Sequence, residues 1–261
     1  MTSIRAFIQH LSVSVAFLSR LPVPERLTGT DFSTFKRATW CFPLAGIIVC
    51  IPAILAAYLI SFTTPTALIV VITFLIIQTI VTGALHEDGM ADTIDGFGGG
   101  KNTQAKLDIM KDSAIGTYGV VALILTYLLK ISILFTIADY QLYKMFFAII
   151  SAHTFARGLQ ILFWHSLPVA RYRGLSHQIG RPDKATAWIA LAFGTILAFF
   201  IIAFVFSAFQ IVSAFLLASL AFVGFRYLCL RQIRGQTGDT IGAMFILAEI
   251  AFLFGLATSF S

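Results

Sequence analysis

The 261-residue chain is strongly apolar: 58% of its residues are hydrophobic, 26 are Phe, and only 11% are charged. With a mean hydropathy of +0.90, it has too little polar surface to solvate a globule of this length, which excludes a water-soluble domain. The net charge of +6 comes without the interleaving of basic and aromatic residues that is typical of nucleic-acid binding. The sequence therefore predicts an integral membrane protein that contacts a lipid bilayer and no nucleic acid.

The first twenty residues are expected to form an amphipathic helix along the membrane surface. Their apolar residues recur at helical spacing, and they are Ile4, Phe7, Ile8, Leu11, Val15 and Leu18. A signal peptide is the competing interpretation, but no convincing small-x-small cleavage site follows.

Seven apolar runs are long enough to cross a hydrocarbon core, which takes about 20 helical residues. They are Trp40 to Phe62, Pro65 to Leu85, Ile115 to Ala138, Leu142 to Trp164, Thr186 to Ser207, Phe209 to Leu228 and Thr240 to Ser259. The runs are continuous and do not alternate, which favours helices over a membrane barrel. We find no internal repeat, so the fold predicted is one all-α polytopic bundle of about seven helices that spans residues 1–261 as a single domain.

The loops carry an asymmetric charge. Counting spans places four basic segments on one side, and their basic residues are Arg5, Arg20, Arg26, Lys36, Arg37, Lys101, Lys106, Lys111, Arg171, Arg173, Arg181, Lys184, Arg231 and Arg234. The turns on the other side carry few charges. With the positive-inside rule, the N-terminus and the polar loops are expected to face the cytoplasm.

Acidic residues are scarce in this chain, and several gather in the segment His86–Gly96. On a helix of about 100° per residue, Asp88, Asp92 and Asp95 fall within an arc of about 60°, with Glu87 to one side. Like charges about 4 Å apart repel by roughly 1 kcal/mol even in water, so the cluster favours a bound cation. Mg²⁺ suits such a site, since it takes a few carboxylates together with phosphate oxygens and water. The alternative is a solvated acidic loop.

A second polar block, Lys106–Ser113, has Asp108 and Asp112 one helical turn apart. It is followed by Gly116–Gly119, just where the third span begins. Small residues at a helix start can form a cradle of backbone amides for an anion. Glycines that permit close helix packing are the equally weighted alternative.

A third polar block, Arg234–Ala243, precedes the last span. Thr237 offers a hydroxyl and Asp239 a carboxylate on the same side of the membrane as the acidic cluster, which makes them expected substrate contacts. Asp239 or Thr240 is also a reasonable ordinary helix N-cap.

Within the spans, Arg157 and Glu249 are the ionisable residues most expected to face the bundle interior. For Arg157, structural pairing and contact with a substrate phosphate are equally weighted interpretations. For Glu249, a structural role is favoured.

Taken together, these blocks resemble the cobalamin synthases, also called adenosylcobinamide-GDP ribazoletransferases. The resemblance covers nearly the whole chain. It is carried by FLSRLPVP (17–24), HEDGMADTIDGFGGG (86–100), IMKDS (109–113), GTYG (116–119), ARG (156–158), SLP (166–168) and TGDTIGA (237–243). The chain departs from the family pattern at Ala114, where many members carry Arg, and this puts one phosphate contact in doubt.

The resemblance implies an enzyme of the prokaryotic cytoplasmic (inner) membrane that joins adenosylcobinamide-GDP to α-ribazole, or to α-ribazole 5′-phosphate, with Mg²⁺ and with release of GMP. In that chemistry Asp88, Asp92 and Asp95 would hold one or two Mg²⁺ ions with Glu87 beside them. His86 or Asp112 is the expected base for the ribazole hydroxyl. Lys111 is the expected phosphate cation, and the active site would face the cytoplasm. The oligomeric state, a homo-oligomer included, stays open.

Two other classes remain as alternatives. The CDP-alcohol phosphotransferases also use clustered Asp residues and Mg²⁺, but their Asp-Gly-x-x-Ala-Arg pattern is not reproduced here, since Asp92 and Thr93 follow Asp88 and Gly89 where that pattern has Ala and Arg. A transporter would explain the presence of Arg157, Glu249 and Lys130 within the spans. Its clustered acids would be expected near mid-span, whereas the acidic cluster of this chain is expected at the cytoplasmic edge.

Overall fold

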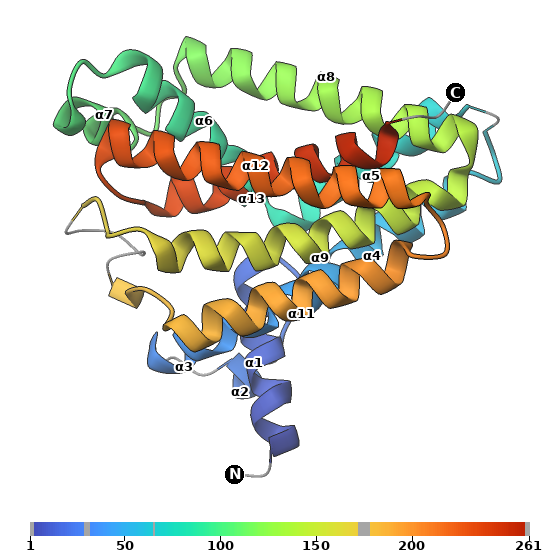
Figure 1. Cartoon of the computed structure of the whole chain (residues 1–261), viewed down its shortest axis with the longest axis horizontal. Helices are drawn as coiled ribbons and strands as arrows, with labels where there is room; N and C mark the ends of the chain where they lie inside the picture. The colour runs from blue at the N-terminus through green and yellow to red at the C-terminus, as the bar shows by residue number, and fades with distance from the viewer. Residues whose placement is uncertain (1–2, 29–31, 65, 172–177, 259–261) are drawn as a thin grey trace.

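The computed structural model describes residues 3–28, 32–64, 66–171 and 178–258. Within these ranges the chain forms a bundle of long helices that run side by side (Figure 1). Among the described residues, six helical stretches are long and apolar enough to cross a membrane. They are α4 (Phe42–Ile60, extended back to Thr34), α8 (Thr117–Tyr140), α9 (Leu142–Ser166), α11 (Lys184–Ile202), α12 (Ala208–Ile233) and α13 (Gly238–Ala257). The predicted all-α, multi-pass membrane fold is confirmed.

The second predicted span differs from the expectation. Helix α5 (Ala67–Thr82) ends before Leu85, and α6 (Leu85–Gly99) leaves it at an angle of 87°. The break lies at Gly83 and Ala84, which have φ angles of 65° and 57° in the left-handed region. Glycine adopts this conformation at little cost, whereas alanine is found there only when its surroundings impose it. The acidic block is therefore a separate helix turned across the bundle, and counting the bent pair as one span gives up to seven.

Shorter helices surround the first span. The predicted N-terminal helix is present as α1 (Ser3–Leu18), which packs against α4 with Val15 and Leu18 buried and Ile4 exposed. It is followed by α2 (Glu25–Thr28), α3 (Phe32–Ala38) and the 3₁₀ helix η1 (Thr39–Cys41). A further short helix, α7 (Thr103–Ile109), follows α6.

Helices α9 and α13 form the centre of the bundle. They pack against each other, and the other spanning helices lie around them: α4 and α11 contact α9, while α12 and α6 contact α13 (Figure 1). Their membrane-length windows are far more buried than those of the other spans. Polar residues on α9 and α13 are therefore placed inside the protein and away from lipid.

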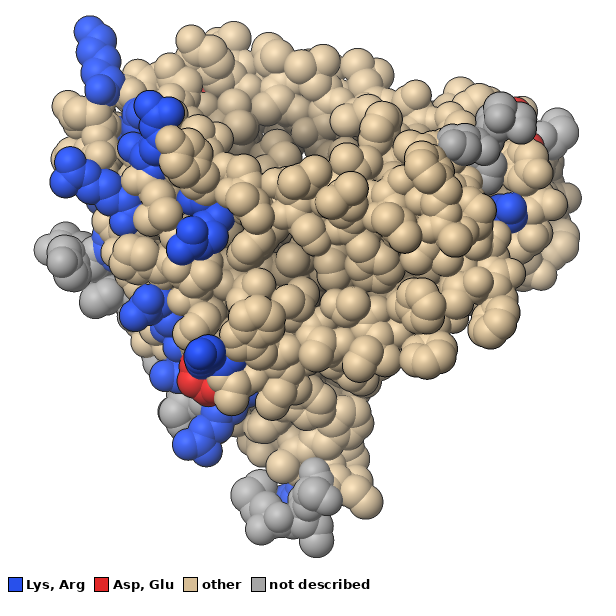
Figure 2. Space-filling model, viewed as in Figure 1, with Lys and Arg blue, Asp and Glu red and all other residues tan. Residues whose placement is uncertain are grey.

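The charges are distributed along the bundle axis as the loop pattern predicts. Figure 2 shows most of the visible Lys and Arg side chains gathered at one end of the long helices, and the broad flank between the two ends is almost free of charge. Helix α7 and the start of α13 lie at this basic end (Figure 1). The polar blocks of the sequence thus meet at one end of the bundle.

Candidate active site

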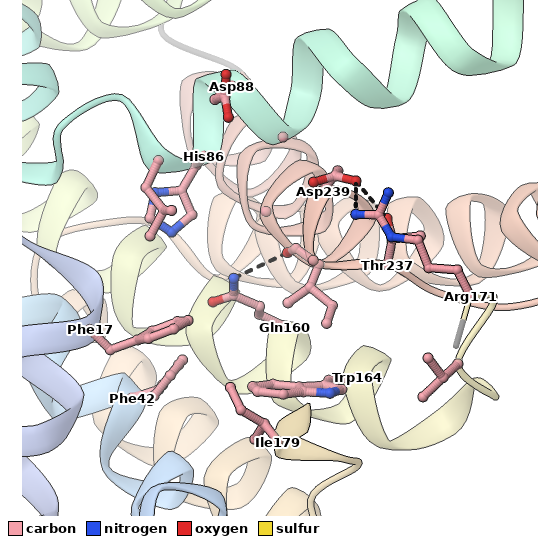
Figure 3. Close-up of a pocket in the computed structure, with 16 residues that line it drawn as sticks. Phe17, Phe42, His86, Asp88, Gln160, Trp164, Arg171, Ile179, Thr237 and Asp239 are labelled. Carbon is pink, nitrogen blue, oxygen red and sulfur yellow. Dashed lines mark hydrogen bonds and ion pairs between the residues drawn. The ribbon is translucent and has the colours of Figure 1, made fainter. Parts of the chain in front are cut away.

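A cavity of about 200 Å³ lies at the basic end, where α6, α9, α13 and the segment after α9 meet (Figure 3). One side of it is polar. The polar side chains that line it are His86, Asp88, Gln160, Arg171, Thr237 and Asp239. The other side is largely aromatic, with Phe17, Phe42, Trp164 and Ile179. The structure therefore brings the acidic block and the block at the start of α13 to one site.

Helix α6 reaches this site because it crosses the start of α13 closely. A Cβ atom placed on Gly89 would lie 2.7 Å from the carbonyl oxygen of Asp239, so only glycine fits at this crossing. Gly242 lies on the same interface, facing the backbone of His86. The close approach at Gly89 brings the helix that carries Asp88 against the start of α13, where Asp239 lies.

Three carboxylates make up the acidic cluster of the site, namely Asp88, Asp92 and Asp239. Asp88 and Asp239 line the cavity, and Asp92 follows Asp88 by one turn of α6. Burial raises the pKa of Asp92 to about 7, and the charges of Asp88 and Asp239 act in the same direction. Asp239 was expected as a substrate contact, and the structure adds it to the cluster.

Among the described residues, no group of three His, Cys, Asp or Glu side chains is arranged so that it could hold a metal ion. Mg²⁺ is commonly held by one or two carboxylates together with substrate phosphates and water, so it does not require such a group. Burial raises the pKa of Asp92 most, and a cation bound beside it would relieve the further effect of the neighbouring carboxylates.

A cation of the protein itself already faces the cluster. Arg171 Nη2 lies 3.2 Å from Asp239 Oδ2, and Thr237 Oγ1 donates to the same oxygen at 3.1 Å. Two backbone hydrogen bonds hold the loops together: Ala170 N donates to Gln236 O at 2.9 Å, and Gln236 N donates to Pro168 O at 2.8 Å. This isolated bridge brings Arg171 to the start of α13 from 68 residues away.

Thr237 caps α13. Its hydroxyl accepts from Thr240 N, while Thr240 Oγ1 accepts from Thr237 N, which completes a capping box. The N-cap is thus Thr237, and the expectation of Asp239 or Thr240 in this role was wrong. Asp239, in the first turn, is left free to face the cavity.

Asp95 was expected among the metal ligands, and the structure places its carboxylate at the start of α8. Its two carboxylate oxygens accept hydrogen bonds from Gly116 N and Gly119 N, both at 2.8 Å, at the start of α8. The predicted anion cradle therefore exists, and the anion in it is a carboxylate of the protein. A Cβ atom on either glycine would collide with Asp95. We accordingly place Asp95 as the group that fixes α6 to α8.

Three further predicted site residues do not line the cavity. Glu87 points between α6 and α8, where Tyr127 Oη donates to its Oε1 at 3.4 Å. Lys111 is exposed and 3.6 Å from Asp108, and Asp112 is exposed and accepts from Ala114 N. The structure groups Glu87 with the α8 interface and the other two with the turn after α7.

Arg157 is completely buried and contacts His86, which lines the cavity. Its Nη1 lies 2.6 Å from His86 Nε2 and 2.9 Å from Gln160 Oε1, and its guanidinium stacks 3.7 Å above the ring of Phe245. Arg157 does not line the cavity, and its partners among the described residues are His86 and Gln160, where pairing with Glu249 or with an acid of the cluster was expected.

A second buried polar group ties the spans together deeper in the bundle. Lys130 Nζ of α8 lies 2.8 Å from Glu249 Oε2 of α13, and His153 Nε2 of α9 lies 3.1 Å from Glu249 Oε1. Glu249 is buried and paired, as the structural role favoured for it predicts. Its partners are Lys130 and His153, whereas Arg157 contacts His86.

Sequence reasoning did not predict Arg171, Gln160 or Trp164 as residues of the cavity. Arg171 was considered only as a charge that sets topology, and Gln160 and Trp164 were read as parts of a span. The one available signal was for Arg171, which belongs to a basic segment on the same side as the acidic block. Nothing in the local sequence marks Gln160 or Trp164, because their position depends on packing between helices far apart in the chain.

The fold and the site define a polytopic helical membrane protein with a carboxylate cluster and an arginine at the basic end of the bundle. The sequence profile of the family described as "Cobalamin-5-phosphate synthase" matches residues 10–257. This chain belongs to that family. No solved structure matches it.

Curated relatives cover almost the entire chain. One from Sinorhizobium sp is 43% identical over 256 residues, covering 96% of this chain and 97% of its own. One from Sinorhizobium medicae is 40% identical over 261 residues, covering 98% and 99%. One from Bradyrhizobium diazoefficiens is 38% identical over 251 residues, covering 96% and 94%. Each bears the name adenosylcobinamide-GDP ribazoletransferase.

Proposed function

We propose that this chain is an adenosylcobinamide-GDP ribazoletransferase. It transfers the adenosylcobinamide phosphate group from adenosylcobinamide-GDP to a hydroxyl of α-ribazole, or of α-ribazole 5′-phosphate. The products are adenosylcobalamin, or its 5′-phosphate, and GMP. Family membership and the shared name of relatives that match the chain from end to end support this assignment. The observation that carries it in the structure is the cavity in which Asp88, Asp239 and Arg171 meet.

Mg²⁺ is the cation we propose for the acidic cluster. Asp88 and Asp92 would hold it from α6, with Asp239 facing them from α13. When bound, Mg²⁺ would neutralise charge on the pyrophosphate of the nucleotide-activated substrate. We place Asp95 and Glu87 outside this ligand set, since the first caps α8 and the second faces Tyr127.

The chain's own residues supply the remaining electrostatics. Arg171 lines the cavity and can turn its guanidinium from Asp239 towards a phosphate, which is the role expected for Lys111. His86 carries its hydrogen on Nδ1, because Arg157 donates to Nε2, so it offers the cavity a donor. The acceptors available for the proton of the attacking hydroxyl are then the carboxylates of Asp88 and Asp239.

We propose the cytoplasmic face of the inner membrane as the location of the site. The cavity lies at the end of the bundle where basic side chains gather (Figure 2), and the positive-inside rule assigns that end to the cytoplasm. A nucleotide-activated substrate would then enter from the aqueous side.

The experiment that tests the function uses the purified protein in lipid nanodiscs with Mg²⁺. Adenosylcobinamide-GDP and α-ribazole together are expected to give GMP and a corrinoid product, while omission of either substrate gives neither. A matched reaction with CDP-linked alcohols should give no product. Turnover of CDP-linked substrates by folded protein, without reaction of adenosylcobinamide-GDP, would refute the proposal.

A further inference from the structure

The segment that carries Arg171 runs from the end of α9 past the start of α13. We call residues 166–171 the strap. Its middle is held by Gln236 through the two backbone hydrogen bonds described above, and its end by the contact of Arg171 with Asp239 (Figure 3). Val169 and Arg171 of the strap line the cavity. The path of the strap therefore decides where the guanidinium of Arg171 lies.

The start of the strap is held by an arginine of a neighbouring spanning helix. Arg226 Nε of α12 donates to Ser166 Oγ at 3.1 Å, and Arg226 Nη2 donates to the carbonyl oxygen of Ser166 at 3.4 Å. Ser166 is the last residue of α9, where carbonyl groups lack partners within the helix and the helix dipole is negative. The guanidinium of Arg226 thus caps α9 at the point where the strap begins.

No other described contact accounts for the charge of Arg226. It is half-buried on a helix of membrane-spanning length, where a charged side chain is costly unless it has a defined partner. Among the described residues, no carboxylate lies within ion-pair distance of it. Its hydrogen-bond partners in the described part of the chain are both atoms of Ser166. The charge of Arg226 therefore acts on the junction between α9 and the strap.

The strap also fits closely against the segment before α13. A Cβ atom on Gly235 would collide with the carbonyl oxygen of Pro168, so only glycine fits at this approach. Leu167 is completely buried. Two of the three contacts that hold the strap, those with Arg226 and Gln236, do not involve the side chain of Arg171.

This division matters when a phosphate binds. In the proposed reaction the guanidinium of Arg171 turns from Asp239 towards the pyrophosphate, so the strap loses its contact with that carboxylate. The contacts with Arg226 and Gln236 then remain to hold the backbone. A charged side chain on a backbone that is already ordered binds its partner without the entropy cost of ordering a loop.

We propose that Arg226 is a positioning residue for Arg171, and that it acts by fixing the start of the strap at the end of α9. The inference rests on the proposed function and adds a residue outside the cavity to it. Arg226 does not line the cavity, so its effect reaches the substrate through Arg171. The effect should therefore follow adenosylcobinamide-GDP, whose pyrophosphate Arg171 faces, and leave α-ribazole unaffected.

The substitution that tests this is Arg226→Met, which keeps a long side chain suited to a spanning helix and removes every donor. KM for adenosylcobinamide-GDP should rise about 3- to 10-fold, while KM for α-ribazole should change less than about twofold. Arg226→Lys keeps a cation that can donate to Ser166, so it should recover part of this loss. Arg231→Met, at an exposed position on the same helix, is the matched control and should change neither value.

A double variant separates positioning from a general structural role. In protein that already carries Arg171→Ala, Arg226→Met should cost less than about twofold more, because the residue that it positions is gone. An equal loss from Arg226→Met with and without Arg171 would overturn the proposal. Equal rises in KM for both substrates would overturn it as well.

Hydrogen exchange tests the strap without the reaction. Ala170 N donates to Gln236 O, so this amide should be protected in the wild-type protein in nanodiscs. Arg226→Met should speed exchange in peptides that cover residues 167–171 about 3- to 10-fold, and Arg231→Met should not. Unchanged exchange in folded Arg226→Met protein would overturn the proposal. A protected strap in wild-type protein that releases no GMP would instead refute the proposed function.

Discussion

The side chain of Arg157 meets that of His86 inside the protein, with 2.6 Å between Arg157 Nη1 and His86 Nε2. An arginine has no lone pair to offer, so His86 Nε2 is the acceptor and the ring hydrogen lies on Nδ1. This arrangement argues against the role of general base that the sequence position of His86 indicates. It leaves His86 as a neutral group held in one orientation beside the acidic cluster.

The substitution His86→Gln separates these two roles. The Gln side chain keeps an acceptor for Arg157 and cannot act as a base of similar strength. We expect kcat/KM to stay within about tenfold of wild type, whereas loss of a general base costs 10²–10⁴-fold. A loss of that size in folded protein would restore His86 as the base. His86→Leu, which leaves Arg157 without this acceptor, should lower the unfolding temperature as well.

Asp95 provides the second prediction. Because both of its oxygens accept backbone amides at the start of α8, Asp95→Asn should destabilise the protein by about 1–3 kcal/mol. The Mg²⁺ concentration that gives half-maximal activity should not change. Thermal unfolding in detergent and a Mg²⁺ titration of activity measure the two effects separately. A large rise in the Mg²⁺ requirement with normal stability would return Asp95 to the ligand set.

Arg171 and Lys111 are the two candidates for the cationic side chain that binds the substrate phosphate. Arg171 lines the cavity, whereas Lys111 is exposed beside Asp108. Arg171→Ala should lower kcat/KM for adenosylcobinamide-GDP by about 10- to 100-fold, since charged hydrogen bonds of this kind contribute 1.5–3 kcal/mol. Lys111→Ala should change it less than threefold. If steady-state assays gave the opposite ranking, Lys111, in the turn after α7, would be the residue that binds the substrate phosphate.

The buried group around Glu249 is predicted to be structural. Glu249→Gln leaves Lys130 as an uncompensated buried charge, which typically costs 3–5 kcal/mol. The double variant Lys130→Met with Glu249→Leu removes both charges and should recover most of the stability. Thermal unfolding of the wild type, Lys130→Met, Glu249→Leu and the double variant forms a double-mutant cycle. Additive losses would mean that the two side chains do not interact.

Composition and loop charges were sufficient to predict the bundle. A hydrocarbon environment requires long apolar helices, and basic residues concentrate in the loops on one side of the membrane. The break at Gly83 and Ala84 was not predictable, since an alanine at positive φ is imposed by its surroundings. The helical spacing of the acidic block was read correctly, but the spacing cannot show which neighbour each carboxylate meets.

The site depended on contacts between distant segments. Asp95 meets Gly116 and Gly119 across a gap of more than twenty residues, and Arg171 meets Asp239 across 68. Local patterns identified Asp88, Asp92, Thr237 and Asp239, since polar residues are conspicuous in so apolar a chain. They could not identify Trp164, which differs from a lipid-facing tryptophan only in where its helix packs.

The acidic cluster itself is tested by Asp92→Asn, which keeps the shape of the side chain and removes its charge. Activity should fall about 100-fold or more, in line with the loss of one group that stabilises transition-state charge. Asp108→Asn, on the exposed face of α7, is the matched control and should be silent. Normal turnover by folded Asp92→Asn protein would exclude this residue from cation binding.

The decisive measurement is GMP release by the wild-type protein in nanodiscs from adenosylcobinamide-GDP and α-ribazole, first with Mg²⁺ and then with a chelator. We predict Mg²⁺-dependent GMP release matched mole for mole by the cobalamin product, stopped by the chelator and restored by added Mg²⁺. Equal GMP and cobalamin formation in the presence of the chelator would contradict a cation held by Asp88 and Asp92.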